Sequence, residues 1–180
     1  YNELVSGSDD IMPVRSGLKL TYEDFVLFPE DGKRHEIVDG EHCVTPSPNT
    51  RHQQISGNIF GLLWVYLRAH AAGRVFQAPY DVVLSPVDVI EPDVIYVSNE
   101  RASIVTPANI QGSPDLVVEI TSPSTRARDE TMKRRLYERS DVLEYWVVDP
   151  EIDVVRVYRR VGGLAGAGDS DSAFDRPQEL

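Results

Sequence analysis

The sequence has few of the features that mark secreted, membrane or nucleotide-binding proteins. Its single cysteine, Cys43, excludes a disulfide within the chain, and this favours a reducing, cytoplasmic location. No apolar run approaches the roughly 18–20 residues that a membrane helix needs, and the first residues lack a basic-then-apolar signal pattern, so we expect no membrane partner. The sequence also lacks zinc-finger spacing, a P-loop, a dinucleotide-binding glycine pattern and a Gly-x-Ser-x-Gly elbow.

Positive charge is also scarce overall. The formal net charge is −11, which argues against a protein that coats nucleic acid by charge alone. The exception is the segment 124–140, where basic residues outnumber acidic ones. Such a run is usually a solvated helix face, but a phosphate-contacting surface beside an active site has the same composition. The sequence leaves both interpretations open.

The length and composition predict one globular domain. A chain of 180 residues, of which 41% are hydrophobic, is long enough to bury a core. Residues 1–17 are polar and irregular, and we expect them to form an N-terminal arm. We place the folded domain at residues 18–160 and a flexible, acidic C-terminal tail at residues 161–180, where glycine, serine and aspartate are frequent.

The order of the predicted elements indicates an α/β fold. A hairpin over residues 34–41 turns at Asp39-Gly40, a pair that tolerates positive φ. A long helix begins near Thr50, where Thr50 and Gln53 have the spacing of a capping box. The other expected elements are helices at residues 20–25 and after residue 124, and strands at residues 75–84, 94–97, 116–120, 143–148 and 154–158. This order predicts a mixed β-sheet flanked by helices on both sides.

Glu119 is the one acid inside an otherwise apolar predicted strand, residues 116–120. Side chains alternate along a strand, so Glu119 shares a face with Val117 and Thr121. An ionised carboxylate in such a strand is costly unless a cation or hydrogen-bond donors meet it. The sequence therefore predicts that a cation or hydrogen-bond donors lie opposite Glu119.

Two further acids lie at or inside predicted strands. Glu36 lies in the hairpin, and Asp93 immediately precedes the strand at residues 94–97. If that strand pairs with the strand of Glu119, the two carboxylates converge, and convergent carboxylates are the ligands that Mg²⁺ prefers. Lys133, on the following helix, could lean back toward this site and offset transition-state charge.

These residues belong to a larger set of recognisable pieces. The pieces are Glu36 to Glu41, His52, Pro92-Asp93, Pro114 to Glu119, Ser122 to Ser124, Asp129, Lys133, Tyr137 and Glu144 to Pro150. As a set they resemble the PD-(D/E)xK nuclease superfamily and, more narrowly, the Uma-two-type putative endonucleases, long catalogued as a domain of unknown function. The resemblance extends over residues 18–160.

The resemblance implies a restriction-endonuclease-like core and metal-dependent hydrolysis of phosphodiester bonds by a metal-activated water. By position, it implies that Asp93 and Glu119 bind Mg²⁺, or alternatively Mn²⁺, and that Glu36 is an auxiliary catalytic acid. The resemblance therefore implies an endodeoxyribonuclease, whose nucleic-acid substrate is DNA. Nucleases of this fold often act as homodimers, so a homodimer is expected.

One position departs from the superfamily pattern. The lysine expected two residues after Glu119 is replaced by Thr121, which lies on the same strand face but has no charge. Lysines of this superfamily are also found on a neighbouring helix, and Lys133 is the candidate substitute. His52, Thr121 and Asp129 are candidate accessory residues.

Each of these residues also has an interpretation without catalysis. Glu119 could pair with a nearby arginine, Asp93 could be an ordinary turn residue, and Lys133 could face solvent on a basic helix. Glu36 could be a solvated hairpin residue, and His52 a hydrogen-bonding surface residue. The competing hypothesis is therefore a catalytically inactive nuclease-fold module that binds nucleic acid or a protein partner. Asp93 and Glu119 carboxylates within reach of one ion, with the Lys133 ammonium close by, would favour the enzyme, whereas a solvent-facing Lys133 and a Glu119–arginine pair would favour the module.

Overall fold

The fold is described from a computed structural model, which covers residues 18–45, 47–123, 125–161 and 174–180. The predicted N-terminal arm, residues 1–17, lies outside the described residues. In the part of the chain that is described, no helix is long and apolar enough to span a membrane.

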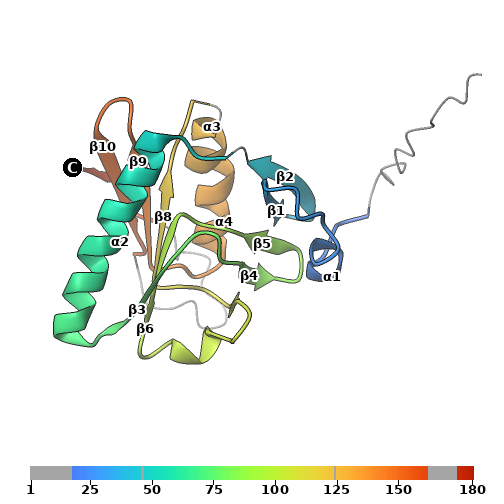
Figure 1. The fold of residues 1–180 in the computed structure, drawn as a ribbon, viewed down its shortest axis with the longest axis horizontal. Helices are drawn as coiled ribbons and strands as arrows, with labels where there is room; N and C mark the ends of the chain where they lie inside the picture. Colours follow the sequence, from blue (N-terminus) through green and yellow to red (C-terminus); the bar gives the residue numbers. More distant parts are fainter. Residues whose placement is uncertain (1–17, 46, 124, 162–173) are drawn as a thin grey trace, which may run out of the picture.

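The elements follow one another in the order shown in Figure 1. The helical segments are α1 (Tyr22–Phe25), α2 (Thr50–His70), the 3₁₀ turn η1 (Ala102–Ile104), α3 (Arg126–Arg128), the π-helical turn η2 (Asp129–Lys133) and α4 (Arg134–Arg139). The strands are β1 (Arg34–Val38), β2 (Glu41–Thr45), β3 (Gly73–Gln77), β4 (Val82–Ser85), β5 (Asp88–Ile90), β6 (Val94–Ser98), β7 (Ile110–Gln111), β8 (Leu116–Ile120), β9 (Glu144–Asp149), β10 (Val154–Arg159) and β11 (Gln178–Glu179).

The described strands form two mixed sheets. A six-stranded sheet has the order β11-β10-β9-β8-β6-β3, with β8 and β9 parallel and its other pairs antiparallel. A five-stranded sheet has the order β2-β1-β5-β4-β7, with β4 and β7 parallel. The predicted α/β class with helices around a mixed sheet is confirmed, but the prediction contained one sheet where the structure has two.

The second sheet arises where the predicted strand at residues 75–84 divides. The structure has β3 and β4 there, in different sheets, and Pro79 lies between them. Proline has no N–H to donate to a ladder and its φ is fixed, so a strand is interrupted at that point. The single predicted strand was therefore wrong.

The two faces of the six-stranded sheet have different coverings. Leu116, Val118 and Ile120 of β8 pack against Ile55, Ile59 and Leu63 of α2 in one cluster. Val117, on the opposite face, belongs to a second cluster with Leu136 and Tyr137 of α4 and with Val38 and Val82 of the five-stranded sheet. Glu119 shares the face of Val117, so its side chain is directed toward η2 and α4 and away from α2.

The C-terminal residues lie against the same sheet. Strand β11 pairs antiparallel with β10, and Phe174 packs against the second cluster. Residues 174–180 of the predicted flexible tail are therefore placed against the folded domain. The rest of that tail, residues 162–173, lies outside the described residues.

Helix α2 begins at Thr50, as the sequence predicts, but its N-cap lies one residue earlier than the capping-box pattern indicates. The N-cap is Asn49, whose Oδ1 accepts a hydrogen bond from the backbone N–H of His52 at 2.9 Å. The predicted Thr50–Gln53 capping box was wrong, because Thr50 already lies in the first turn. A short side-chain oxygen at the N-cap satisfies one of the N–H groups that the helix leaves unpaired.

We expect the Asn49→Ala variant to lose about 1 kcal/mol of unfolding free energy, the usual cost of deleting an N-cap acceptor. Urea denaturation of the purified variant measures the change. The matched control is Thr50→Ala, which we expect to change stability by less than about 0.5 kcal/mol. A larger loss in the control than in Asn49→Ala would contradict this assignment of the cap.

Candidate active site

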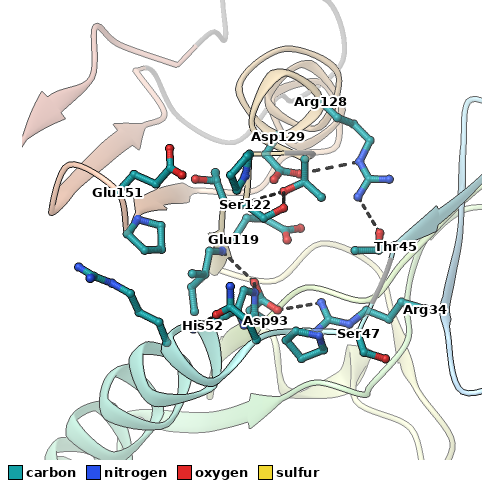
Figure 2. Close-up of a pocket in the computed structure, with 18 of the residues that line it drawn as sticks. Arg34, Thr45, Ser47, His52, Asp93, Glu119, Ser122, Arg128, Asp129 and Glu151 are labelled. Carbon is teal, nitrogen blue, oxygen red and sulfur yellow. Dashed lines mark hydrogen bonds and ion pairs between the residues drawn. The ribbon is translucent and has the colours of Figure 1, made fainter.

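A pocket of about 610 Å³ opens where the two sheets, the start of α2 and the η2 turn meet. Figure 2 shows the side chains around it: His52 comes from α2, Asp93 from the segment before β6, and Arg128 and Asp129 from the α3–η2 junction. Its lining includes Asp93, Glu119, His52, Thr121, Asp129 and Lys133. The structure therefore brings six of the seven predicted site residues to one cavity. The seventh, Glu36, lies behind Lys133.

Lys133 is the group that meets Glu119. Its Nζ donates to Glu119 Oε1 at 2.8 Å and to Glu36 Oε1 at 2.8 Å, and only 2% of Lys133 is exposed. The hydroxyl of Tyr137 donates to the same Glu119 oxygen at 2.5 Å. Lys133 thus does not face solvent, and within the described residues the ion pairs of Glu119 include no arginine.

The π-helical turn places Lys133. Asp129 and Lys133 are the two buried residues of η2, and Tyr137 follows in α4. A π turn widens the helix locally, and such turns are frequent at functional sites. Part of the predicted basic face is therefore turned inward. Thr121 contributes no charge there: its hydroxyl donates to the backbone oxygen of Val148 at 3.3 Å.

Asp93 lies next to Glu119 because β6 and β8 pair antiparallel, as the sequence analysis required. The register sets Val94 opposite Val118, and Asp93 Oδ2 accepts from the backbone N–H of Ile120 at 2.8 Å. Arg34 contacts Asp93 Oδ1 at 2.7 Å. His52 Nε2 lies 3.1 Å from Asp93 Oδ2, so His52 is a partner of a buried acid and not a surface residue.

Burial and charge act in opposite directions on the pKa values of the acids. Burial raises the pKa of Glu119 to about 8, because its effect outweighs that of the Lys133 ammonium, which lowers the pKa. For Asp93, burial alone would raise the pKa, but the His52 hydrogen bond and the Arg34 charge lower it. For Glu36, burial is likewise outweighed by Lys133, so its pKa is lowered. Lys133 is itself buried, yet the Glu119 and Glu36 charges raise its pKa, which keeps it protonated.

The acidic side chains of the pocket are the groups that could bind a divalent cation. Among the described residues, no three His, Cys, Asp or Glu side chains are grouped as a metal cluster. Mg²⁺, however, is often bound through only one or two carboxylates, with waters and substrate phosphates completing its shell. The buried Oδ1 of Asp129 has no hydrogen-bond partner within the described part of the chain. The Asp129 Oδ1 atom is therefore an oxygen that such a cation could use, although Asp93, Glu119 and Asp129 do not form a three-ligand cluster.

Three residues of the site were given no role by the sequence analysis. Tyr137 belongs to the matching pieces, and its position one turn after Lys133 was the available signal. Arg34 lies in the predicted hairpin next to Glu36, with nothing in the sequence to connect it to Asp93. Arg128 donates to Thr45 Oγ1 at 2.7 Å, across a sequence separation of 83 residues.

Glu91 lies beside the site, between β5 and Asp93, and offers a test of its electrostatics. Burial, reinforced by the Asp81 charge, raises the pKa of Glu91 from 4.5 to about 7. The folded protein therefore binds this proton more tightly than the unfolded chain does. Its stability falls as the pH rises from about 4.5 to about 7.

We expect Glu91→Gln to be more stable than the parent protein at pH 8 and not at pH 4. The full shift would correspond to about 3 kcal/mol, which we reduce to about 1–2 kcal/mol because Glu91 is partly exposed and screened. Urea denaturation at the two pH values gives the difference. Glu41→Gln, at an exposed position of β2, is the control and should show no such gain. Equal stability of Glu91→Gln and the parent at pH 8 would contradict the burial argument.

The sequence matches a known protein family, and the fold is similar to a solved structure. A family model, Uma2, described as putative restriction endonuclease, matches residues 22–173. None of the curated proteins matches the sequence. Among solved structures, the fold is similar to a putative nuclease belonging to DUF820 from Anabaena variabilis ATCC 29413. The TM-score is 0.67 at 21% identity, over 78% of this chain and 79% of that chain.

Proposed function

The chain belongs to the Uma2 family of putative restriction endonucleases, and from this premise we propose that it is a Mg²⁺-dependent endonuclease that hydrolyses phosphodiester bonds in DNA. The observation that carries the proposal is the buried Lys133–Glu119 contact of 2.8 Å beside Asp93 in the pocket. This contact supports Lys133 as the substitute for the lysine that Thr121 replaces. Mn²⁺ is the alternative cofactor.

Asp93 and Glu119 would hold the cation, with Asp129 as a further oxygen donor. When bound, the ion would supply charge stabilisation at the phosphate and a more acidic water. Arg34 and His52 orient the Asp93 carboxylate, and Tyr137 and Lys133 fix Oε1 of Glu119.

The cations of the site would act on the substrate directly. Lys133 stays protonated, so its ammonium can offset negative charge that develops on the phosphate. Glu36 keeps Lys133 in place by accepting one of its hydrogen bonds, which is a positioning role. Arg128, which lines the pocket, is placed to contact a neighbouring phosphate.

A second function has a specific observation in its favour. Both oxygens of Asp93 already have partners, namely Arg34, His52 and the Ile120 N–H. A site whose acids are compensated by the protein's own cations is also what a nuclease-fold module without activity would have. Such a module would bind nucleic acid or a protein partner without cutting.

A cleavage assay separates the two functions. The purified protein is incubated with single-stranded, duplex and branched DNA in Mg²⁺ or Mn²⁺, and with EDTA as the metal-free reference. We expect cleavage that EDTA stops and that Glu119→Gln abolishes, while Glu41→Gln cleaves as the parent does. Absence of cleavage on every substrate would favour the inactive module.

A further inference from the structure

Three central residues of the candidate site are almost fully buried. Asp93 is 2% exposed, Glu119 is 4% exposed and Lys133 is 2% exposed. A phosphate that reacts at these residues has to enter the pocket, because their functional atoms do not reach the outer surface. The shape of that pocket therefore determines which nucleic acids can be cut.

The pocket has the size of a small-molecule site. Its volume of about 610 Å³ lies within the roughly 300–1,000 Å³ that is usual for pockets enclosing one small ligand. A pocket of this volume can hold about one nucleotide. Base-paired DNA presents its phosphates on a stiff double helix, whereas an unpaired strand can bend to place one nucleotide in a recessed pocket.

Three prolines, Pro48, Pro123 and Pro150, line the pocket from three different loops. Each proline ring fixes its own φ, which restricts the backbone at these three positions. Figure 2 shows the cavity bounded by α2 below, by the α3–η2 segment above and by the β9–β10 turn on a third side.

The surroundings of the pocket also disfavour a duplex. Arg51 pairs with Asp153 at 2.6 Å, and Arg126 pairs with Asp149 at 2.7 Å. Glu151, 53% exposed, stands at the pocket and pairs with Arg126 as well. Proteins that hold duplex DNA commonly neutralise about 6–10 phosphates with lysine and arginine, and these arginines already have carboxylate partners.

From the burial, volume and charge of this pocket we propose that the substrate is an unpaired strand: a single-stranded segment, flap or bulge enters the pocket, and fully paired duplex is a poor substrate. The proposal rests on the proposed nuclease function. It adds that the flexibility of an unpaired strand, which a double helix lacks, selects the substrate.

The test uses one fluorescently labelled DNA sequence in three forms: single strand, blunt duplex, and duplex with a central unpaired bulge. Binding is measured by fluorescence anisotropy in EDTA, and cleavage in Mg²⁺. We expect the single strand to bind at least roughly tenfold more tightly than the blunt duplex, and the single strand and the bulge to be cut at least roughly tenfold faster.

A variant that narrows the pocket provides a second measurement. Ser47 is exposed and lines the pocket, and Ser47→Trp should weaken single-strand binding at least roughly fivefold by filling it. Ser103→Trp is the matched control, because Ser103 is equally exposed but lies in η1, outside the pocket lining.

The outcomes separate this proposal from the proposed function. If duplex and single strand are bound equally tightly and cut equally fast, and Asp93→Asn cuts neither, the substrate proposal is wrong. The proposed nuclease function would still hold. The protein could instead bind single strand in preference to duplex, lose this preference in Ser47→Trp, and cut none of the three forms. That result would support the unpaired strand as the ligand of the pocket and would contradict the proposed nuclease function. Single-strand binding by Ser47→Trp equal to that of the parent would overturn the substrate proposal.

Discussion

The Lys133→Met variant is expected to lose about 3–5 kcal/mol of unfolding free energy near neutral pH, the usual cost of removing one partner of a buried ion pair. Lys133 Nζ contacts both Glu36 and Glu119 at 2.8 Å, and all three residues are buried. Methionine fills a similar volume, so the loss comes from leaving the Glu36 carboxylate without its cation and Glu119 without one of its hydrogen-bond donors. Urea denaturation followed by circular dichroism measures it.

The loss should depend on pH in a defined direction. The pKa of Lys133 is raised above 10.5, so its contribution is fully present below that pH and is lost only as the pH rises through the folded value. The pKa of Glu36 is lowered from 4.5, so its contribution is present above about pH 4.5 and is lost as the pH falls further. The pKa of Glu119 is raised to about 8, so its charge pairs with Lys133 only as the pH rises through that value. The difference between variant and parent should therefore shrink in acid and grow as the pH rises through about 8.

Lys33→Met is the matched control for this experiment. The Lys33 side chain is 58% exposed and pairs with Asp31 on the surface, so its removal should change stability by less than about 1 kcal/mol. A loss of less than about 1 kcal/mol for Lys133→Met as well would show that the buried pair does not hold η2 against β8.

The Asp93→Asn variant is expected to cut DNA roughly 100-fold more slowly than the parent or worse, because several kcal/mol of transition-state stabilisation depend on a metal-binding carboxylate. The amide keeps an oxygen that can accept from the Ile120 N–H, as Asp93 does at 2.8 Å. The variant should therefore still fold, which circular dichroism checks. What it loses is the negative charge that a cation requires.

Local patterns predicted part of the centre of the site. The alternation of β8 gives the face of Glu119, whereas the π-helical turn η2, which the sequence analysis did not predict, directs Lys133 inward. The same reasoning required β6 to pair with β8, which the register of Val94 and Val118 confirms. These contacts link residues that are close in sequence or lie on adjacent strands, so short-range geometry determines them.

The contacts that the sequence did not predict are the distant ones. Glu36 meets Lys133 across 97 residues, and Arg34 meets Asp93 across 59 residues. They depend on how the five-stranded sheet packs on the other one, which no local period encodes. The roles of Asp93, Glu119 and Lys133 in metal binding and catalysis, and the homodimer, stay predictions.

The rate of DNA cleavage in Mg²⁺ by the parent, Asp93→Asn and Asp115→Asn tests the central claim most directly. Asp115 is a suitable control because it also follows a proline, yet it binds Ser98 N–H and Arg101 at the opposite end of β8. We predict cleavage by the parent and by Asp115→Asn, and a loss of at least roughly 100-fold in Asp93→Asn. Equal cleavage by the parent and Asp93→Asn would contradict the assignment of this pocket as the active site.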